Sequence, residues 1–67
     1  MNNFGKRLKE LRLENCLRQQ ELGEMLSVNQ RTISYWENSV SEPDYDMLVK
    51  IAILFDVSTD YLLGLEN

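Results

Sequence analysis

The chain has 67 residues, a mass of 7.9 kDa and a net charge of −4. A chain this short buries only about 60% of the surface that it exposes when unfolded, which excludes a two-domain enzyme with a deep cleft. The absence of histidine excludes histidine-based catalysis, and one cysteine, Cys16, excludes an intrachain disulfide or a CxxC zinc site. We expect a single domain over residues 1–67, with no metal, cofactor or catalytic activity.

Neither the apolar runs nor the N-terminus indicates a membrane or a secretory route. The longest apolar run, residues 51–55, is far shorter than a membrane span, and the first residues lack a signal-peptide pattern. A small domain without disulfides fits a reducing compartment, so we expect a cytoplasmic protein.

Apolar residues at helical spacing predict the first two helices. The first should cover residues 4–14 and end at Asn15, a residue type that tolerates the left-handed conformation. The second begins near Arg18, with Leu22 and Leu26 on its inner side. Gly23 inside it costs roughly 1 kcal/mol relative to alanine, which indicates close approach by the backbone of another helix.

The third helix is predicted to begin after an N-cap at Asn29 and to run to about Asn38. At about 100° per residue, its side chains divide into two faces. The face that can pack contains Thr32, Ile33, Trp36 and Glu37. The opposite face is polar and outward, and contains Gln30, Arg31, Ser34, Tyr35 and Asn38.

Two further helices complete an all-α domain without strands. The fourth opens at Pro43 and Asp44 and ends at residues 56–57, and the fifth runs over residues 59–63, between a Ser58 cap and Gly64. The expected core residues are Phe4, Leu8, Leu11, Leu22, Leu26, Ile33, Trp36, Leu48, Ile51, Phe55 and Leu62.

The second and third predicted helices are joined by about three residues around Ser27, and the third carries the outward polar face. This arrangement, over about residues 18–38, is that of a helix-turn-helix, whose second helix enters the major groove of DNA. Glutamine and arginine at the start of that helix are residue types that read base edges, adenine and guanine respectively.

The sequence resembles the Cro- and phage-repressor-type helix-turn-helix family, also called the xenobiotic-response-element (XRE) family. The resemblance covers about residues 4–64. It rests on LKELR at residues 8–12, LRQQELG at 17–23, VNQRTISYWEN at 28–38, and the segment from Pro43 to VSTDYLL at 57–63. It implies five helices in a lambda-repressor-like domain, and a transcriptional repressor that binds a near-palindromic double-stranded DNA operator as a homodimer.

The resemblance also implies roles for individual residues. Gln30, Arg31 and Tyr35 match base-reading positions, with Ser34 beside them. Gln19 matches a phosphate-contacting glutamine, which would position the protein without carrying sequence information. Asn29 and Asn38 match positions that hold the DNA backbone at either end of the reading helix. Arg12 and Glu37 match a salt bridge between the first and third helices.

Three departures from the family pattern affect affinity more than fold. Arg18 replaces a capping serine or threonine, which leaves Glu21 alone to complete the cap, although Arg18 itself can contact phosphate. Ser27 replaces a glycine in the turn. Residues 39–42 replace a glycine and basic residues, so this loop should hold phosphate poorly, and Glu42 could repel it.

The charge distribution leaves a second function open. Residues 1–36 hold six of the seven basic side chains and carry +2, whereas residues 37–67 carry −6. The basic half suits DNA. The acidic half, with Leu13, Val40, Leu62 and Leu65 as possible exposed apolar residues, suits a protein-interaction module such as an antitoxin or anti-regulator. Salt dependence separates the two, because DNA binding weakens as salt rises.

Overall fold

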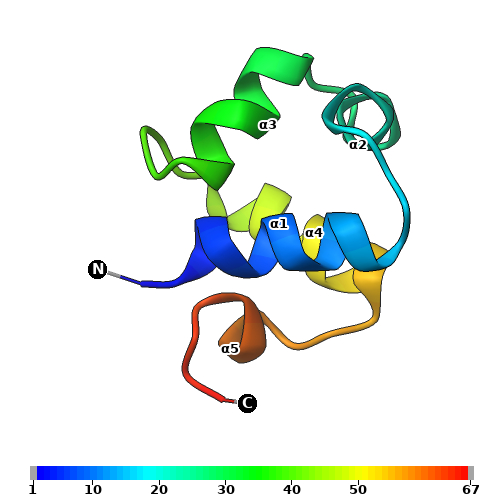
Figure 1. The fold of residues 1–67 in the computed structure, drawn as a ribbon. Coiled ribbons are helices and arrows are strands. Elements are labelled where there is room, and N and C mark those ends of the chain that lie inside the picture. The colour runs from blue at the N-terminus through cyan, green and yellow to red at the C-terminus, as the bar shows by residue number, and fades with distance from the viewer. Residues whose placement is uncertain (1, 67) are drawn as a thin grey trace.

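The computed structural model describes residues 2–66 and has five helices in an all-α fold: α1 (Phe4–Glu14), α2 (Gln19–Leu26), α3 (Gln30–Glu37), α4 (Tyr45–Phe55) and α5 (Thr59–Leu62). Within these residues there is no strand. Figure 1 shows α1 across the middle, with α2 and α3 on one side of it and α5 on the other. None of the five helices is long and apolar enough to cross a membrane.

Each of the five helices contributes inward-facing apolar side chains to one core. Nine of the eleven expected core residues are buried, and Phe4 and Trp36 meet edge to face with ring centroids 6.4 Å apart. Leu48 and Phe55 pack against this core but are only partly buried, because they lie at its margin, while the smaller Ala52 turns inward. The buried apolar residues are Phe4, Leu8, Leu11, Leu22, Leu26, Ile33, Trp36, Ile51, Ala52 and Leu62.

Three helices begin with side-chain caps, and the sequence predicts two of them, at Asn29 and Ser58. The side-chain oxygens of Asn29, Asp44 and Ser58 each accept a hydrogen bond from the backbone N–H three residues further on. Each bond satisfies one N–H that the first helical turn leaves unpaired. These caps explain why α3, α4 and α5 start where they do.

α1 ends at Glu14 as expected, but the left-handed residue that follows it lies one position beyond Asn15. Asn15 has a φ of −94°, and Cys16 takes the left-handed conformation with a φ of 57°. The backbone N–H of Leu17 bonds to the carbonyl of Arg12, and that of Cys16 to the carbonyl of Leu13. This paired pattern places the left-handed residue one position after the helix cap.

Gly23 allows a close backbone approach, but from a different partner than expected. A Cβ atom at Gly23 would lie 2.7 Å from the carbonyl oxygen of Val28, in the turn that follows α2, and not against another helix. The Val28 N–H also bonds to the Gly23 carbonyl at 2.9 Å. Gly23 therefore folds the turn back onto its own helix and sets the angle between α2 and α3.

A second close approach, at Gly5, fixes α3 on α1. A Cβ atom here would lie 2.5 Å from the carbonyl oxygen of Trp36. Glycine thus lets the start of α1 cross the end of α3 at backbone contact, which holds α3 with its polar face outward.

Candidate nucleic-acid interface

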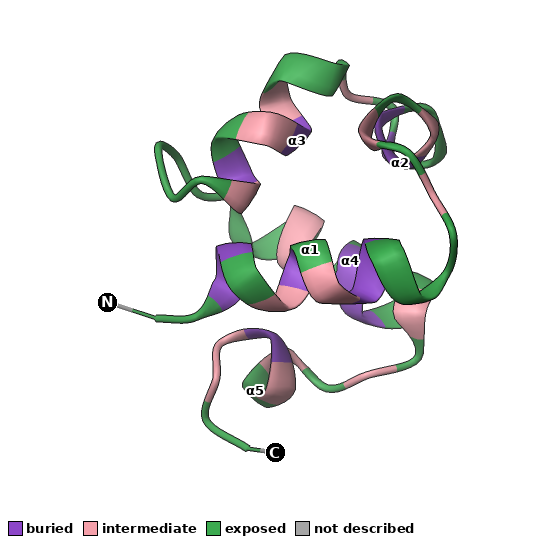
Figure 2. Ribbon diagram, in the orientation of Figure 1, coloured by how far each residue is buried: buried purple, intermediate pink, exposed green. Residues whose placement is uncertain are grey.

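The outward face of α3 is polar and accessible. Gln30, Arg31 and Tyr35 are exposed, whereas Ile33 and Trp36 on the opposite face are buried. Ser34 is half-buried beside them. Figure 2 shows the same division, with the start of α3 exposed and its inner side facing the rest of the domain. This face presents an amide, a guanidinium and a phenol on a helix of the width that the major groove admits.

The starts of α2 and α3 meet through two glutamines. The Nε2 of Gln30 donates to the Oε1 of Gln19 at 3.3 Å, and the Nε2 of Gln19 donates to Glu37 Oε1 at 3.0 Å. The first residue of α3 is therefore hydrogen-bonded to the first residue of α2.

Beneath the two glutamines lies a buried ion pair between α1 and α3. Arg12 Nε donates to Glu37 Oε2 at 2.6 Å and Arg12 Nη2 to Glu37 Oε1 at 3.1 Å. The two side chains are only 9% and 2% exposed. Arg12 Nη1 also donates to the carbonyl of Leu17 at 2.9 Å. Such bidentate geometry fixes the relative orientation of the two helices.

Arg18 projects from the start of α2, with 84% of its side chain exposed. Its backbone N–H donates to Glu21 Oε1 at 2.8 Å, and its Nε lies 3.5 Å from the same oxygen. The hydrogen bond from the backbone N–H of Arg18, aided by its nearby charge, lowers the pKa of Glu21 below its ordinary value. Because an arginine side chain only donates, Glu21 supplies this cap alone, as the sequence predicts.

Two asparagines flank α3. The Oδ1 of Asn29 accepts from the N–H and the hydroxyl of Thr32, at 2.9 and 3.0 Å. The Nδ2 of Asn38 donates to the carbonyl of Ser34 at 2.8 Å, and so caps the end of the helix. Both side chains are exposed. Each therefore has a structural role that leaves its other amide atom free to face solvent.

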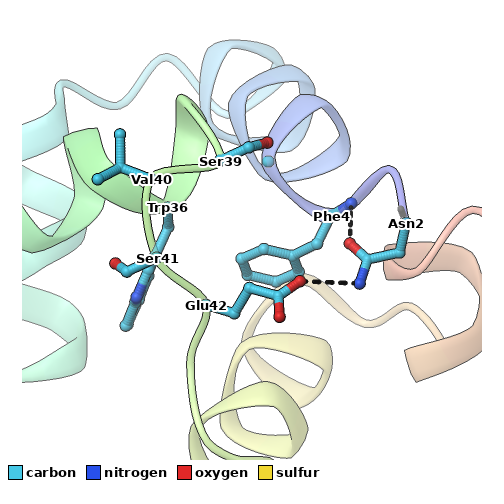
Figure 3. A pocket seen from close by; sticks show the side chains of 8 residues that line it. Asn2, Phe4, Trp36, Ser39, Val40, Ser41 and Glu42 are labelled. Carbon is cyan, nitrogen blue, oxygen red and sulfur yellow. Dashed lines mark hydrogen bonds between the residues drawn. The ribbon is translucent and has the colours of Figure 1, made fainter.

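Two of the departures from the family pattern lie in the turns on either side of α3. Ser27 takes the left-handed conformation at a φ of 61°, and Ser39 does so at 60°. In the loop after α3, Glu42 accepts a hydrogen bond from Asn2 at 3.0 Å, and Asn2 also accepts from the N–H of Phe4 (Figure 3). No pattern in the sequence singles out Asn2, because its partner is 40 residues away.

A hollow of about 310 Å³ lies under this loop, between residues 39–42 and the start of α1. Phe4 and Trp36 are among the residues that line it (Figure 3). Its single carboxylate, Glu42, is the one bonded to Asn2. Residues 2–66 contain no group of three potential metal-ligating side chains.

The structure thus brings some predicted site residues into contact and leaves others apart. Gln19 and Gln30 form one connected set with Arg12 and Glu37. The remaining predicted residues lie along the same two helices without side-chain bonds to this set. We call the eight predicted DNA-facing residues the candidate interface: Arg18, Gln19, Asn29, Gln30, Arg31, Ser34, Tyr35 and Asn38.

The chain is similar to known proteins over nearly its whole length. The sequence profile of the helix-turn-helix family matches residues 8–62. One relative is the HTH-type transcriptional regulator ImmR of Bacillus subtilis, which is 44% identical over 65 residues, or 97% of this chain. The match covers 51% of ImmR, so the chain spans about half the length of that relative.

Two solved structures share the fold. The P22 c2 repressor in complex with a synthetic operator, a protein of Salmonella phage P22, has a TM-score of 0.88 and 33% identity, covering 98% of this chain and all of that one. A transcriptional regulator from Listeria innocua has a TM-score of 0.91 and 30% identity, covering all of this chain and 63% of that one.

Proposed function

This chain belongs to the helix-turn-helix family, and from that premise we propose that it regulates transcription by binding a specific sequence of double-stranded DNA. The observation that carries the proposal is the outward polar face of α3, on a fold that matches an operator-bound repressor at a TM-score of 0.88. The same comparisons favour DNA binding over a module whose main partner is a protein. The proposal includes no catalytic step.

In this proposal, α3 enters the major groove and its first turn reads bases. Gln30 pairs with an adenine and Arg31 with a guanine, because these side chains match the donors and acceptors of those base edges. Ser34 and Tyr35 line the same face one turn further on. Arg18, Gln19, Asn29 and Asn38 lie on either side, where their donors can contact phosphates and fix the helix in the groove.

The protein acts as a repressor and a homodimer on a near-palindromic operator, in the cytoplasm and at the nucleoid. One reading helix contacts few base pairs, and two half-sites about 34 Å apart double that number. The dimer surface is α5 with the tail that follows it, where Leu65 is 73% exposed and Leu63 and Gly64 border a hollow. A bound dimer would repress by blocking access to a promoter.

Selection of binding sites from genomic or random DNA tests the proposal. The expected result is a palindromic consensus with half-sites about one helical turn apart, bound by two chains. The Gln30→Ala variant should change the consensus, and Lys6→Ala, which removes an exposed charge on α1, should not. Failure to enrich any sequence would contradict DNA recognition. Sedimentation of a complex with one chain per operator would contradict the dimer alone.

A further inference from the structure

The outward side of α4 carries a row of exposed apolar residues. Tyr45, Val49 and Ile53 follow one another at four-residue spacing and are 87%, 48% and 74% exposed. Since residues four apart lie one above another on a helix, these three form a ridge of about 12 Å, or about two helical turns. Ile51, on the opposite side of the helix, is fully buried. We call Tyr45, Val49 and Ile53 the α4 ridge.

Neither of the surfaces proposed for DNA and for the dimer includes the α4 ridge. The candidate interface lies within residues 18–38, and the proposed dimer surface is α5 with the tail that follows it. Single exposed apolar residues are ordinary on a protein surface, whereas apolar residues that adjoin one another and are rimmed by polar groups mark an interaction surface. The ridge is therefore available to a further partner.

Acidic side chains flank the α4 ridge. At about 100° per residue, Asp46 and Asp56 fall on the same outward side of the helix, and both are exposed. Lys50 is the only base in residues 37–67, and its Nζ lies 3.4 Å from the carbonyl oxygen of Leu26, at the end of α2. The charge beside the ridge is therefore negative, and the base that could offset it is directed toward another helix.

A hollow opens at the start of the α4 ridge. Its volume is about 220 Å³, and the apolar part of its lining includes Tyr45, Leu48 and Leu63. Glu42 adds a carboxylate to the same lining. Pockets that receive an apolar side chain of a partner are typical of the energetic centres of protein interfaces. The hollow thus offers an anchor point at one end of the ridge, again beside negative charge.

We propose that the α4 ridge is a docking surface for an amphipathic helix of another protein, apolar on one side and with lysine or arginine along its edges. Apolar residues of that helix at i, i+3, i+4 and i+7 pack against the ridge, because a row of residues at four-residue spacing fits the groove of a facing helix. The basic edges lie beside Asp46 and Asp56, where opposite charge steers the encounter and fixes its register.

The two aspartates favour such a partner over a second copy of this chain. Two copies joined at this ridge would bring Asp46 and Asp56 of one chain close to the same residues of the other, and like charges placed together oppose association. DNA is disfavoured for the same reason, because its phosphates are also negative. A basic amphipathic helix complements both the apolar ridge and the charge beside it.

A synthetic helix of leucine and lysine is the probe that tests this surface. A peptide of roughly 15 residues, the length at which isolated helices begin to form, carries leucines at i, i+3, i+4 and i+7 spacing and lysines elsewhere. The same peptide with glutamate in place of lysine is the control for charge. In ¹⁵N NMR titrations, the leucine–lysine peptide should shift the backbone amide resonances of α4 in a saturable way, and the leucine–glutamate peptide should not.

Matched apolar variants test where the peptide binds. Ile53→Ser removes the most exposed aliphatic residue of the ridge, and Leu13→Ser removes an exposed leucine from α1. Ile53→Ser should weaken peptide binding by at least about fivefold, the loss expected for an interface side chain that contributes about 1 kcal/mol. Leu13→Ser should leave the affinity unchanged. Thermal unfolding checks that both variants fold, and Val49→Ser repeats the test if Ile53→Ser does not.

Matched charge variants separate docking from a general attraction between an acidic chain and a basic peptide. The double variant Asp46→Asn/Asp56→Asn removes the two charges beside the ridge. The control, Glu14→Gln/Glu24→Gln, removes two exposed acids from α1 and α2. The first variant should weaken peptide binding several-fold more than the second. Equal losses in the two would attribute binding to total charge and overturn the inference.

Three further outcomes would overturn the inference. The first is the absence of saturable binding by the leucine–lysine peptide, and the second is equal binding by Ile53→Ser and Leu13→Ser. The third is self-association of the free chain that disappears in Ile53→Ser, as followed by sedimentation, which would assign the ridge to a second copy. DNA recognition is tested apart from all three, because Ile53→Ser should bind the operator as wild type does. A wild-type chain that selects no operator would overturn the proposed function and leave this inference standing.

Discussion

The proposed role of Arg31 in reading bases can be tested without disturbing the fold. It lies in the first turn of α3, exposed, and forms no side-chain hydrogen bond or salt bridge with residues 2–66. Arg31→Ala should therefore leave folding intact, weaken operator binding by about 1–3 kcal/mol per half-site, and relax the preference at one base pair. Binding to a library of single-base-pair operator variants, with urea unfolding as the check on folding, measures both effects.

The Arg31→Lys variant is the matched control for charge. Lysine keeps the positive charge but lacks the planar fork that pairs with guanine. It should relax the same base pair while it retains most of the non-specific affinity. An equal loss across the whole library in Arg31→Ala would show that Arg31 does not read bases and that the reading face lies elsewhere.

At the residue scale, the sequence predicts which side chains face outward but not which of them touch. The helical wheel separates Gln30 and Arg31 from Ile33 and Trp36, because the periodicity of a helix alone decides this. The bond between Gln19 and Gln30 depends on how closely α2 and α3 approach, which the turn at Gly23 sets in three dimensions. The pairing of Arg12 with Glu37, 25 residues apart, came only from the family resemblance.

At the element scale, the turn between α2 and α3 is strained by a serine. Ser27 holds a φ of 61°, a conformation that costs a non-glycine residue roughly 1 kcal/mol. Ser27→Gly should raise the free energy of unfolding by about 1 kcal/mol, or about 4–8 °C in Tm for a domain of this size. Thermal unfolding followed by circular dichroism measures the shift.

Two other serines provide comparison variants for this turn. Ser39 has a φ of 60°, so Ser39→Gly should also raise Tm. Ser41 is in the same loop without a positive φ, so Ser41→Gly should lower Tm or leave it unchanged, because glycine adds freedom to the unfolded chain. A Tm in Ser27→Gly that does not exceed the wild-type value would contradict strain at this position.

The start of α2 should make stability depend on pH. The backbone N–H of Arg18 lowers the pKa of Glu21 in the folded state from its ordinary value of 4.5. The contribution of the Glu21 charge to stability is therefore present above pH 4.5 and is lost as the pH falls through the lower, folded pKa. Glu21→Gln keeps an acceptor but removes the charge. The difference in free energy of unfolding between wild type and this variant should be larger at pH 7 than at pH 3; a difference that stays constant with pH would contradict the shift.

Element positions follow from the sequence where local chemistry decides them. The bounds of α1 and the caps of α3 and α5 agree with expectation, because apolar spacing determines the first and a single capping side chain determines each of the others. The left-handed residue after α1 was misplaced onto Asn15, since a residue-type preference does not say which carbonyls the chain turns back to reach. The marginal burial of Leu48 likewise depends on how α4 packs, and no local pattern specifies that.

At the scale of the whole molecule, the chain has a net charge of −4, but none of the eight residues of the candidate interface is acidic. The interface has two basic residues, Arg18 and Arg31, and two acids on the same helices are bonded: Glu37 to Arg12, and Glu21 to Arg18. This local balance matters more for DNA than the total charge, because counterion release depends on the phosphates that are contacted. Two basic residues per chain predict a shallower salt dependence than that of strongly basic DNA-binding proteins.

Replacement of Arg18 tests that salt dependence directly. Its side chain is 84% exposed, and its contact with Glu21, at 3.5 Å, is long enough to be exchanged for a phosphate. Each phosphate contact contributes about 0.9 to the slope of log affinity against log salt, so Arg18→Ala should reduce the slope by about 1 per half-site and about 2 for a dimer. Lys9→Ala removes an equal charge from the exposed side of α1 and should leave the slope unchanged.

Because phosphate contacts carry no sequence information, the preferred operator should stay the same in Arg18→Ala. Equal slopes for wild type and Arg18→Ala would mean that the start of α2 meets DNA without its arginine. A slope that changes equally in Lys9→Ala would attribute the effect to total charge.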